Sequence, residues 1–170
     1  MKRRCQWVPK GNALYEKYHD EEWGRPIHDD CVLFEFLILE SAQAGLSWET
    51  VLKKRAAYKK AFANFNVKKV AQFTKHDVKK LMQNAGIIRN RLKIEAAISN
   101  AQIFITLQKE YGSFSEYVWS WKDQDAKLLS ADMRKRGFRF FGPTICHAYI
   151  QAVGIINDHS LDCFLFKKRR

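Results

Sequence analysis

Apolar residues recur at intervals of three and four along most of the chain, which is the spacing of one buried face of an α-helix. The run CVLFEFLILE at residues 31–40 predicts a strongly buried helix that ends near Ala44. A second apolar stripe runs from Val51 to Phe62, and a third lies on a long helix that continues to about residue 110. The strict alternation that marks strands is nearly absent, so the pattern predicts an all-α fold.

Residues with a preference for helix ends mark where these helices begin and stop. The expected N-cap positions are Asp29 or Asp30, Ser47, Thr74 with Asp77 ahead of a short helix at about 75–83, and Ser113 with Glu116. Pro143 suits the first turn of a final helix, and Gly112 and Gly154 suit C-terminal positions. With three prolines, eight glycines and no internal repeat, the chain is expected to form one domain over residues 1–170.

Glu40 lies within the most apolar of these helices. It falls on one helical face with a set of hydrophobic residues: Leu33, Phe36, Leu37 and Ala44. Glutamate is almost never fully buried unless it has a partner. The spacing therefore marks Glu40 as a candidate functional residue, just before a turn at Gly45 and before Trp48.

The net charge of the chain indicates which class of molecule it binds. Thirty Lys and Arg residues stand against 18 Asp and Glu residues, which gives a net charge of +12. Such an excess favours a polyanion, with nucleic acid ahead of a membrane surface, although charge that merely keeps the protein in solution is the alternative. The N-terminus, MKRRCQWVPK, has no apolar signal-peptide core, and no stretch reaches the roughly 18 apolar residues of a spanning helix. We expect a cytoplasmic protein whose four cysteines are thiols or metal ligands, and not disulfides.

A short glycine-containing turn joins two predicted helices in the stretch KKLMQNAGIIRNRLK, residues 79–93. The second helix begins among Arg89, Arg91 and Lys93, and free N–H groups at a helix start with cations nearby can hold a phosphate. An ordinary helical corner with a solvated basic face explains the spacing equally well. A helix that reads bases in the major groove is disfavoured, because the residues from Ile94 onward are too apolar.

Aromatic residues gather in the first third of the chain: Trp7, Tyr15, Tyr18, Trp23 and Trp48. Such rings are most often part of a core. They also suit a nucleobase turned out of a duplex, which needs stacking faces and a polar group to read its edge. Tyr18 and Glu40 are candidates for that polar edge, and a cationic base would be attracted by ring faces and carboxylate alike.

Cysteine and histidine occur together near both ends of the chain. Cys5 and His19 lie near one end, and His159 and Cys163 lie four residues apart near the other. Two thiolates and two imidazoles would make a closed, structural tetrahedral site. The intervals match no short zinc-finger pattern, so spacing alone supports such a site only weakly. Cys31 and Cys146 are expected to be core thiols, and His28, His76 and His147 to be surface or turn residues.

Several long segments resemble the DNA-3-methyladenine glycosylase I family in collinear order. They are RCQWV (4–8), YEKYHDEEWG (15–24), LESAQAGLSWETVLKKR (39–55), NAGIIRNRLKI (84–94), KRGFRFFGPTIC (135–146) and GIINDHSLDC (154–163). The resemblance implies a helix-hairpin-helix DNA glycosylase fold, with the motif at about 75–110. It implies a monofunctional repair enzyme that flips N3-methyladenine out of alkylated double-stranded DNA and hydrolyses its N-glycosidic bond, the start of base excision repair. A monomer without a nucleotide cofactor is expected.

The resemblance also assigns roles to residues that match the family's motifs. Glu40 falls on the catalytic carboxylate, Tyr18 on the hydrogen-bonding tyrosine and Trp48 on the stacking tryptophan, with Tyr15, Trp7 and Trp23 lining the same region. Gly86, Arg89, Arg91 and Lys93 fall in the DNA-binding hairpin. The ligands of a structural Zn²⁺ that joins segments 1–24 and 154–170 fall on Cys5, His19, His159 and Cys163.

The sequence departs from the family's pattern in two places. Only KDQDAKLL separates Trp121 from Ser130, where family members often have a longer segment, and Leu92 replaces a smaller or polar residue. A catalytic Asp after the hairpin, common in the superfamily, has no counterpart, since the nearest acid is Glu95.

Two other functions are rivals to DNA repair: that of a non-catalytic DNA-binding module and that of a zinc-stapled interaction protein. The first leaves Glu40 unexplained, and the second leaves the charge unexplained.

Overall fold

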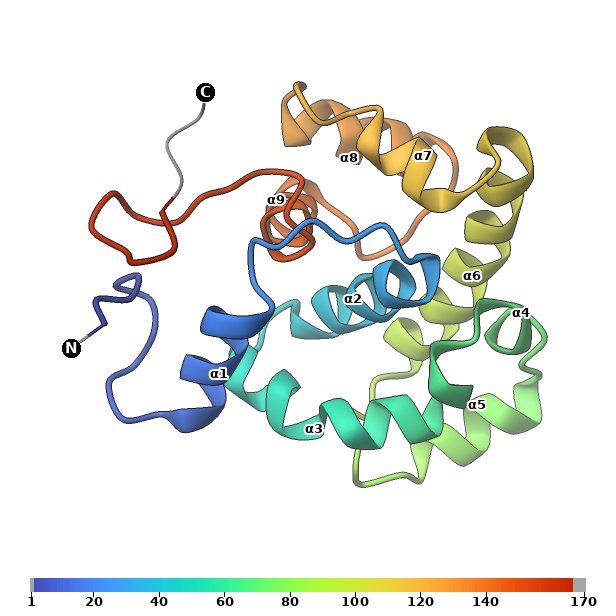
Figure 1. Cartoon of the computed structure of the whole chain (residues 1–170). Coiled ribbons are helices and arrows are strands. Elements are labelled where there is room, and N and C mark those ends of the chain that lie inside the picture. The colour runs from blue at the N-terminus through green and yellow to red at the C-terminus, as the bar shows by residue number, and fades with distance from the viewer. Residues whose placement is uncertain (1, 167–170) are drawn as a thin grey trace.

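The computed structural model describes residues 2–166, and every regular element within that range is a helix, as predicted. Helix α2 (Asp30–Gln43) lies in the middle of the molecule with the other helices packed around it (Figure 1). Below it lie α3 (Trp48–Ala61) and α5 (Lys75–Met82), and above it lies α9 (Pro143–Ala152). The longest helix, α6 (Arg91–Tyr111), connects the lower and upper groups.

The shorter elements complete these two groups. They are α1 (Ala13–Glu21), a 3₁₀ turn η1 (Ala63–Phe65), α4 (Val67–Val70), α7 (Phe114–Trp119) and α8 (Ala126–Lys135). No helix in the described part of the chain is long and apolar enough to span a bilayer.

The predicted helix ends are confirmed with one partial exception. Asp29, and not Asp30, caps α2 by accepting from Val32 N at 3.0 Å, and Thr74 and Asp77 form a reciprocal capping box. Gly112 follows α6 with a φ of +89°, a left-handed conformation that favours glycine. Ser113 accepts from the backbone N–H of Glu116 at 3.0 Å, but the return bond that would complete a capping box is absent between these two described residues.

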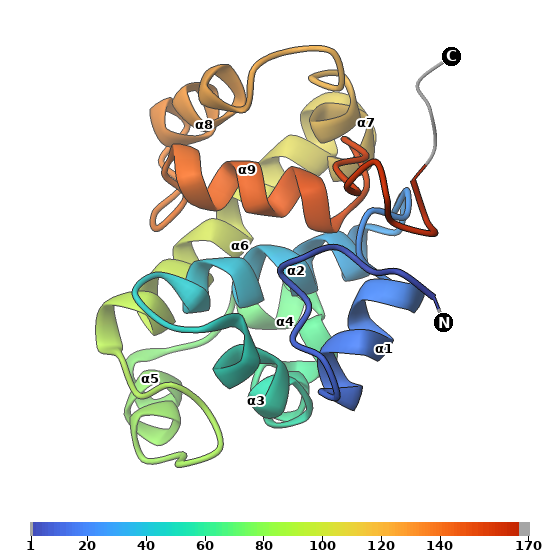
Figure 2. The same cartoon turned by 90° about the vertical axis from the view of Figure 1, so that its left-hand side faces the viewer.

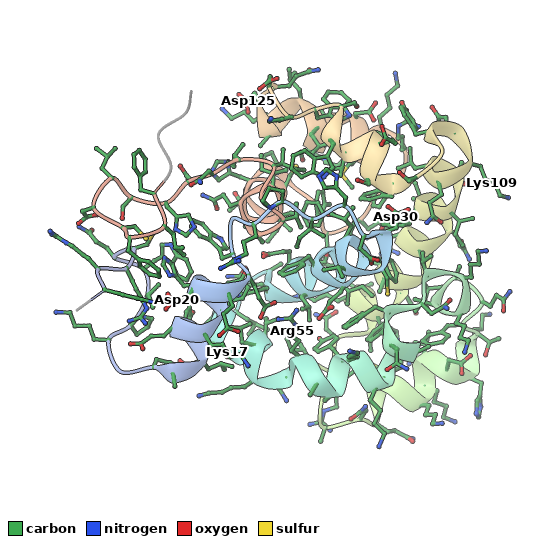
Figure 3. The ribbon with its side chains drawn as sticks, in the orientation of Figure 1. Lys17, Asp20, Asp30, Arg55, Lys109 and Asp125 are labelled. Carbon is green, nitrogen blue, oxygen red and sulfur yellow. The ribbon has the colours of Figure 1, made fainter. Side chains whose placement is uncertain are left out.

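Within residues 2–166, the N-terminal and C-terminal segments lie on the same side of the molecule (Figures 1 and 2). Phe164 N donates to Arg3 O at 2.9 Å, and Ile27 N donates to Val153 O at 3.0 Å. Arg55 is enclosed between α1, α2 and α3 (Figure 3), where it pairs with Glu22 and Glu35 at 2.6 Å each. These contacts hold the N-terminal segment, α2 and α3 together at the end of the molecule where the candidate site lies.

Cys31 is the exception among the cysteine predictions. Cys146 is fully buried as expected, whereas Cys31 is exposed, so its prediction as a core thiol is wrong. The reason is that Cys31 lies in the first turn of α2, where its thiol faces the carbonyl oxygen of Phe65 at 3.6 Å instead of the core. His28, His76 and His147 are exposed as predicted, although His28 also stacks on Trp119 with ring centroids 4.4 Å apart.

Candidate active site and metal centre

A cavity of about 420 Å³ opens between α1, α2, the start of α3 and α9. Every aromatic residue predicted for base binding lines it, together with Glu40; the predicted members are Trp7, Tyr15, Tyr18, Trp23 and Trp48. Its size falls within the range of small-molecule sites. The cavity also has a wall that the sequence did not reveal, formed by Ala148 and Gln151 of α9 and by Asp158 beyond it.

Glu40 reaches this cavity from the third turn of α2, and only 3% of the residue is exposed. Within the described chain, its Oε2 atom has no hydrogen-bond partner. Burial raises the pKa of its carboxyl from 4.5 to about 8. The indole Nε1 of Trp48, in the same cavity, is also buried without an acceptor among the described residues. Buried polar groups are almost always paired, so two unpaired groups lining one cavity indicate a site that is completed by a ligand.

The aromatic rings form an angular enclosure around the carboxylate. The rings of Tyr18 and Trp48 lie 5.4 Å apart at 50°, and those of Trp7 and Trp23 lie 4.9 Å apart at 67°. Trp7 is 39% exposed and stands at the rim, whereas Trp23 and Trp48 are buried. Burial raises the pKa of the Tyr18 hydroxyl well above 10, so it remains a proton donor at neutral pH. The enclosure therefore offers flat apolar faces, two donors and a carboxyl group that is negative once ionised to a planar ligand.

The raised pKa of Glu40 predicts a stability gain when its charge is removed. Because the folded protein binds this proton more tightly than the unfolded chain, the free energy of unfolding should fall as pH rises from about 4.5 towards 8. Glu40→Gln should therefore stabilise the protein by about 2–5 kcal/mol at pH 8 or above and by much less near pH 5. Urea unfolding of both proteins at the two pH values measures this difference. An equal effect at both would show that Glu40 is not desolvated.

The second site is a cluster of the four predicted metal ligands. The ligand atoms of Cys5, His19, His159 and Cys163 all lie within 4.8 Å of one another, and all four residues are buried. Cys5 Sγ lies 3.4 Å from His159 Nδ1, and Cys163 Sγ lies 3.4 Å from His19 Nε2. A tetrahedral zinc ion with bonds of about 2.3 Å to sulfur and 2.0–2.1 Å to nitrogen requires S···N separations of about 3.6 Å. The cluster fits a tetrahedral metal ion.

Groups around the cluster orient its ligands as the surroundings of a metal site do. His19 Nδ1 lies 2.8 Å from Asp20 Oδ1, which leaves Nε2 for the metal. Asp20, near the two chain ends (Figure 3), accepts two bonds from Arg4, and this pairing lowers the pKa of Asp20 to about 2. The backbone N–H of Ser160 points at Cys5 Sγ at 3.4 Å, as expected for a thiolate.

The metal cluster and the aromatic cavity share a wall. The rings of Trp23 and His159 lie 4.7 Å apart, and those of Trp7 and His19 lie 5.4 Å apart. Gly24, with a φ of +75°, allows the chain to pass close to the His159 ring, since an added Cβ would lie 3.0 Å from His159 Nε2. A metal at the cluster would thus support the cavity from behind without entering it.

The predicted DNA-binding residues lie in the turn of residues 83–90 and the start of α6. Arg89 and Arg91 are exposed, and Arg91 makes only a long contact of 3.7 Å to Glu95. The first turn of α6 leaves the N–H groups of Arg91 and Leu92 outside the intrahelical bonding pattern. These groups are available to an anion.

Gly86 of this turn and Lys93 at the start of α6 make contacts within the protein. Gly86 donates its N–H to Asn84 Oδ1 at 2.8 Å, and an added Cβ would meet Ala57 Cβ at 2.9 Å, so close packing against α3 explains the glycine. Lys93 directs its ammonium group inward to the backbone carbonyls of Ala42 and Ala44, because it lies on the side of α6 that faces α2. Sequence spacing could not distinguish this inward lysine from its exposed neighbours.

Known proteins resemble this chain over nearly its whole length. A family model described as methyladenine glycosylase matches residues 7–127 and 121–166, two ranges that overlap at residues 121–127. A DNA-3-methyladenine glycosylase of Haemophilus influenzae is 42% identical over 96% of this chain and 97% of its own. A crystal structure of 3-methyladenine DNA glycosylase I superposes with a TM-score of 0.92 at 42% identity, covering 97% of this chain and 100% of that one.

A variant of 3-methyladenine DNA glycosylase I, solved in complex with 3-methyladenine, superposes equally well. Its TM-score is 0.92 at 36% identity, and the match covers 98% of this chain and 99% of that one. Sequence and fold thus point the same way, and this chain belongs to the methyladenine glycosylase family.

Proposed function

We propose that this protein removes N3-methyladenine from alkylated double-stranded DNA by hydrolysing the N-glycosidic bond, the start of base excision repair. The observation that carries the proposal is the unpaired carboxylate of Glu40 in an aromatic cavity beside the unpaired indole N–H of Trp48. The bound base in the related 3-methyladenine complex supports it. The whole chain acts as one catalytic domain.

The proposed chemistry follows from the charge of the lesion. A base inside a duplex is out of reach, so the nucleotide must be turned out into the cavity, where Trp48 supplies a stacking face and Tyr18 a hydrogen-bonding hydroxyl. Methylation at N3 gives adenine a fixed positive charge and makes it a good leaving group. The Glu40 carboxylate accepts from the exocyclic amine and stabilises the positive charge as the bond breaks. Neutral adenine gains less from both effects, so charge contributes to selectivity as much as shape does.

We propose that the turn of residues 83–90 and the start of α6 form a divergent helix-hairpin-helix motif that holds the DNA backbone. Charge distribution supports this position: residues 49–93 contain 13 Lys or Arg and two acids, a net +11 of the whole chain's +12. This stretch comprises α3, α4, α5 and the turn. Such an asymmetry suits the phosphate backbone of a duplex better than it suits general solubility.

Salt dependence measures the proposed phosphate contacts. Arg89→Ala and Arg91→Ala should each reduce the slope of log affinity against log salt by about 0.9 for undamaged duplex, because each phosphate contact releases counterions. Fluorescence anisotropy with a labelled duplex between low and moderate salt gives the slope. Lys109→Ala, on the opposite end of α6, is the matched control (Figure 3). If both arginine variants keep the parental slope, the DNA-binding face lies elsewhere.

The ion proposed for the Cys/His cluster is a structural Zn²⁺. All four positions of a tetrahedron are filled by protein ligands, which leaves none for substrate or water. Bound there, zinc would cross-link the N-terminal and C-terminal segments and take no part in bond cleavage. Glu40 and the aromatic rings then act alone on the base.

Analysis of released bases tests the proposed activity against its two rivals. The protein is incubated with methylated duplex DNA, and the supernatant is analysed by chromatography and mass spectrometry. We expect free N3-methyladenine without added cofactor, without strand cleavage and without a DNA adduct that borohydride can trap. DNA binding without release would favour a non-catalytic DNA-binding module. The absence of both would favour a zinc-stapled interaction protein.

A further inference from the structure

We propose that Lys93 is a positioning residue that fixes the turn between Glu40 and Trp48 and so couples the DNA-binding hairpin to the base cavity. This inference rests on the proposed function, because the hairpin and the cavity take their roles from it. According to this inference, Lys93 binds backbone carbonyls within the protein and not a DNA phosphate.

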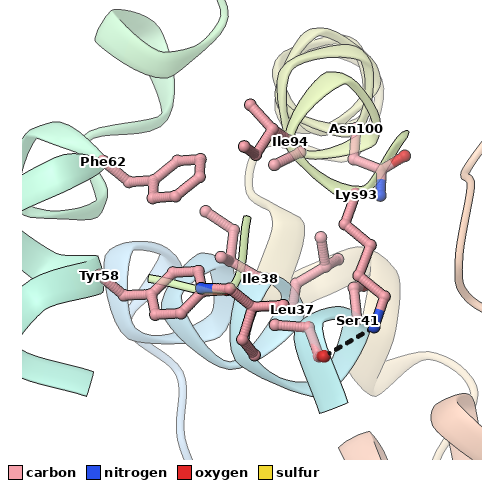
Figure 4. Close-up of a pocket in the computed structure, with 11 residues that line it drawn as sticks. Leu37, Ile38, Ser41, Tyr58, Phe62, Lys93, Ile94 and Asn100 are labelled. Carbon is pink, nitrogen blue, oxygen red and sulfur yellow. Dashed lines mark hydrogen bonds between the residues drawn. The ribbon is translucent and has the colours of Figure 1, made fainter. Parts of the chain in front are cut away.

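The contacts of Lys93 are specific. It lies in the first turn of α6, and its Nζ donates to Ala42 O at 2.9 Å and to Ala44 O. The aliphatic stem lines a small cavity together with Leu37 and Ile38 of α2 (Figure 4). Lys93 is partly buried, and this burial lowers the pKa of its ammonium group.

The carbonyls that Lys93 binds are those that a helix end leaves without partners. The last turn of an α-helix has C=O groups that no intrahelical N–H reaches, and they carry the negative end of the helix dipole. Helix α2 has no basic residue of its own in its last turn. The chain beyond it turns sharply through Gly45, whose φ is +81°. Lys93 therefore supplies from another helix the donor and the positive charge that this end of α2 lacks.

The segment held in this way leads directly into the cavity. Glu40 lies one turn before the end of α2, Gln43 and Ser47 line the cavity, and Trp48 begins α3. The Nζ atom of Lys93 is directed to the backbone carbonyls of Ala42 and Ala44 and has no contact with the Glu40 carboxylate among the described residues. Lys93 therefore acts through the backbone of residues 42–44 and not as a counter-ion of the catalytic carboxylate.

Coupling follows from where the two ends of this contact lie. Lys93 is two residues beyond Arg91 in the first turn of α6. A phosphate held near Arg91 and the turn at residues 44–47 are therefore both in contact with this one helical turn. Loss of the two hydrogen bonds from Lys93 would allow the turn at residues 44–47 to shift. Misplacement of about 1 Å can cost on the order of 100-fold in rate.

A pair of variants separates positioning from phosphate binding. Lys93→Met keeps the stem and removes the donors and the charge, and Arg91→Met removes an exposed cation from the same turn. We expect Lys93→Met to lower the single-turnover excision rate by about 100-fold and to weaken binding of free 3-methyladenine, with an unchanged salt slope for undamaged duplex. Arg91→Met should do the reverse: a lower salt slope with free-base binding intact. A reduced salt slope with normal free-base binding in Lys93→Met would overturn the proposal.

Labelling of the unaltered protein gives an answer that does not depend on how the variants fold. In reductive methylation read by mass spectrometry, Lys93 should resist modification without DNA, while exposed Lys59 and Lys60 react readily. Rapid labelling of Lys93 that slows only when duplex is added would identify it as a phosphate ligand and reject the positioning role. A parental protein that releases no methylated base would refute the proposed function, whereas the labelling result would still report on Lys93.

Discussion

Replacement of Glu40 by Gln should lower the single-turnover rate of N3-methyladenine excision by about 10- to 1000-fold, the range typical of removing one preorganised electrostatic group. The amide keeps the shape and one acceptor of the side chain but not its charge. Affinity for undamaged duplex should hold steady or rise slightly, because one anion disappears from a DNA-binding protein. The loss should not be complete, since the methylated base already leaves readily.

Glu95→Gln is the matched control for this experiment. Glu95 is the first acid after the turn, yet its side chain is 40% exposed and lies 3.7 Å from Arg91, outside the cavity. We expect excision by Glu95→Gln to match the parental rate. A loss in Glu95→Gln that equals the loss in Glu40→Gln would move the catalytic role away from the cavity carboxylate.

Loss of the metal should have the largest effect on stability. The cluster joins residues near both ends of the chain, and binding of a metal to such a closed site supplies folding free energy directly. Cys163→Ser, or removal of the ion by a chelator, should lower the free energy of unfolding by about 5 kcal/mol or more and the Tm by roughly 10–20 °C. Elemental analysis should find one zinc per chain in the parental protein.

Cys31→Ser is the control for this effect, because Cys31 is exposed and remote from the cluster. Its melting temperature should stay close to the parental value. Because Trp23 and Trp7 pack on His159 and His19, metal loss should also weaken free-base binding, by less than it lowers stability. A parental protein without bound metal, or a Cys163→Ser variant with parental melting, would contradict the assignment.

Local rules in the sequence predicted most of the helices. Capping residues such as Thr74 and terminators such as Gly112 act on their immediate neighbours, so their effect can be read without knowledge of the rest of the chain. The left-handed turn at Ala63, Asn64 and Phe65 could not be predicted in this way. Asn tolerates a positive φ better than most residues, but Ala and Phe do not, so the packing of this turn against α2 and α3, with Phe65 buried, must impose it.

The residues of the candidate site likewise fall into those that the sequence pattern could predict and those that it could not. Glu40 could be singled out because a charge on an apolar helical face breaks a periodic pattern, whereas the Gln151 wall of the cavity breaks none. Lys93 shows the limit most clearly. Its spacing from Arg89 and Arg91 predicts a shared basic face, but the approach of α6 to the end of α2 turns this one side chain inward. Contacts of that kind depend on tertiary packing between segments about 50 residues apart.

The dependence of kcat/KM on pH, compared between the parental protein and Glu40→Gln, tests the central claim most directly. The methylated base carries a fixed charge, so the ionisation that matters belongs to Glu40, whose pKa in the free protein is about 8. For the parental protein, kcat/KM on duplex containing N3-methyladenine should rise about tenfold per pH unit below that value and level off above it. For Glu40→Gln it should be low and nearly flat over the same range. Parallel profiles in the two proteins would contradict the claim that an ionised Glu40 carboxylate selects and helps to expel the cationic base.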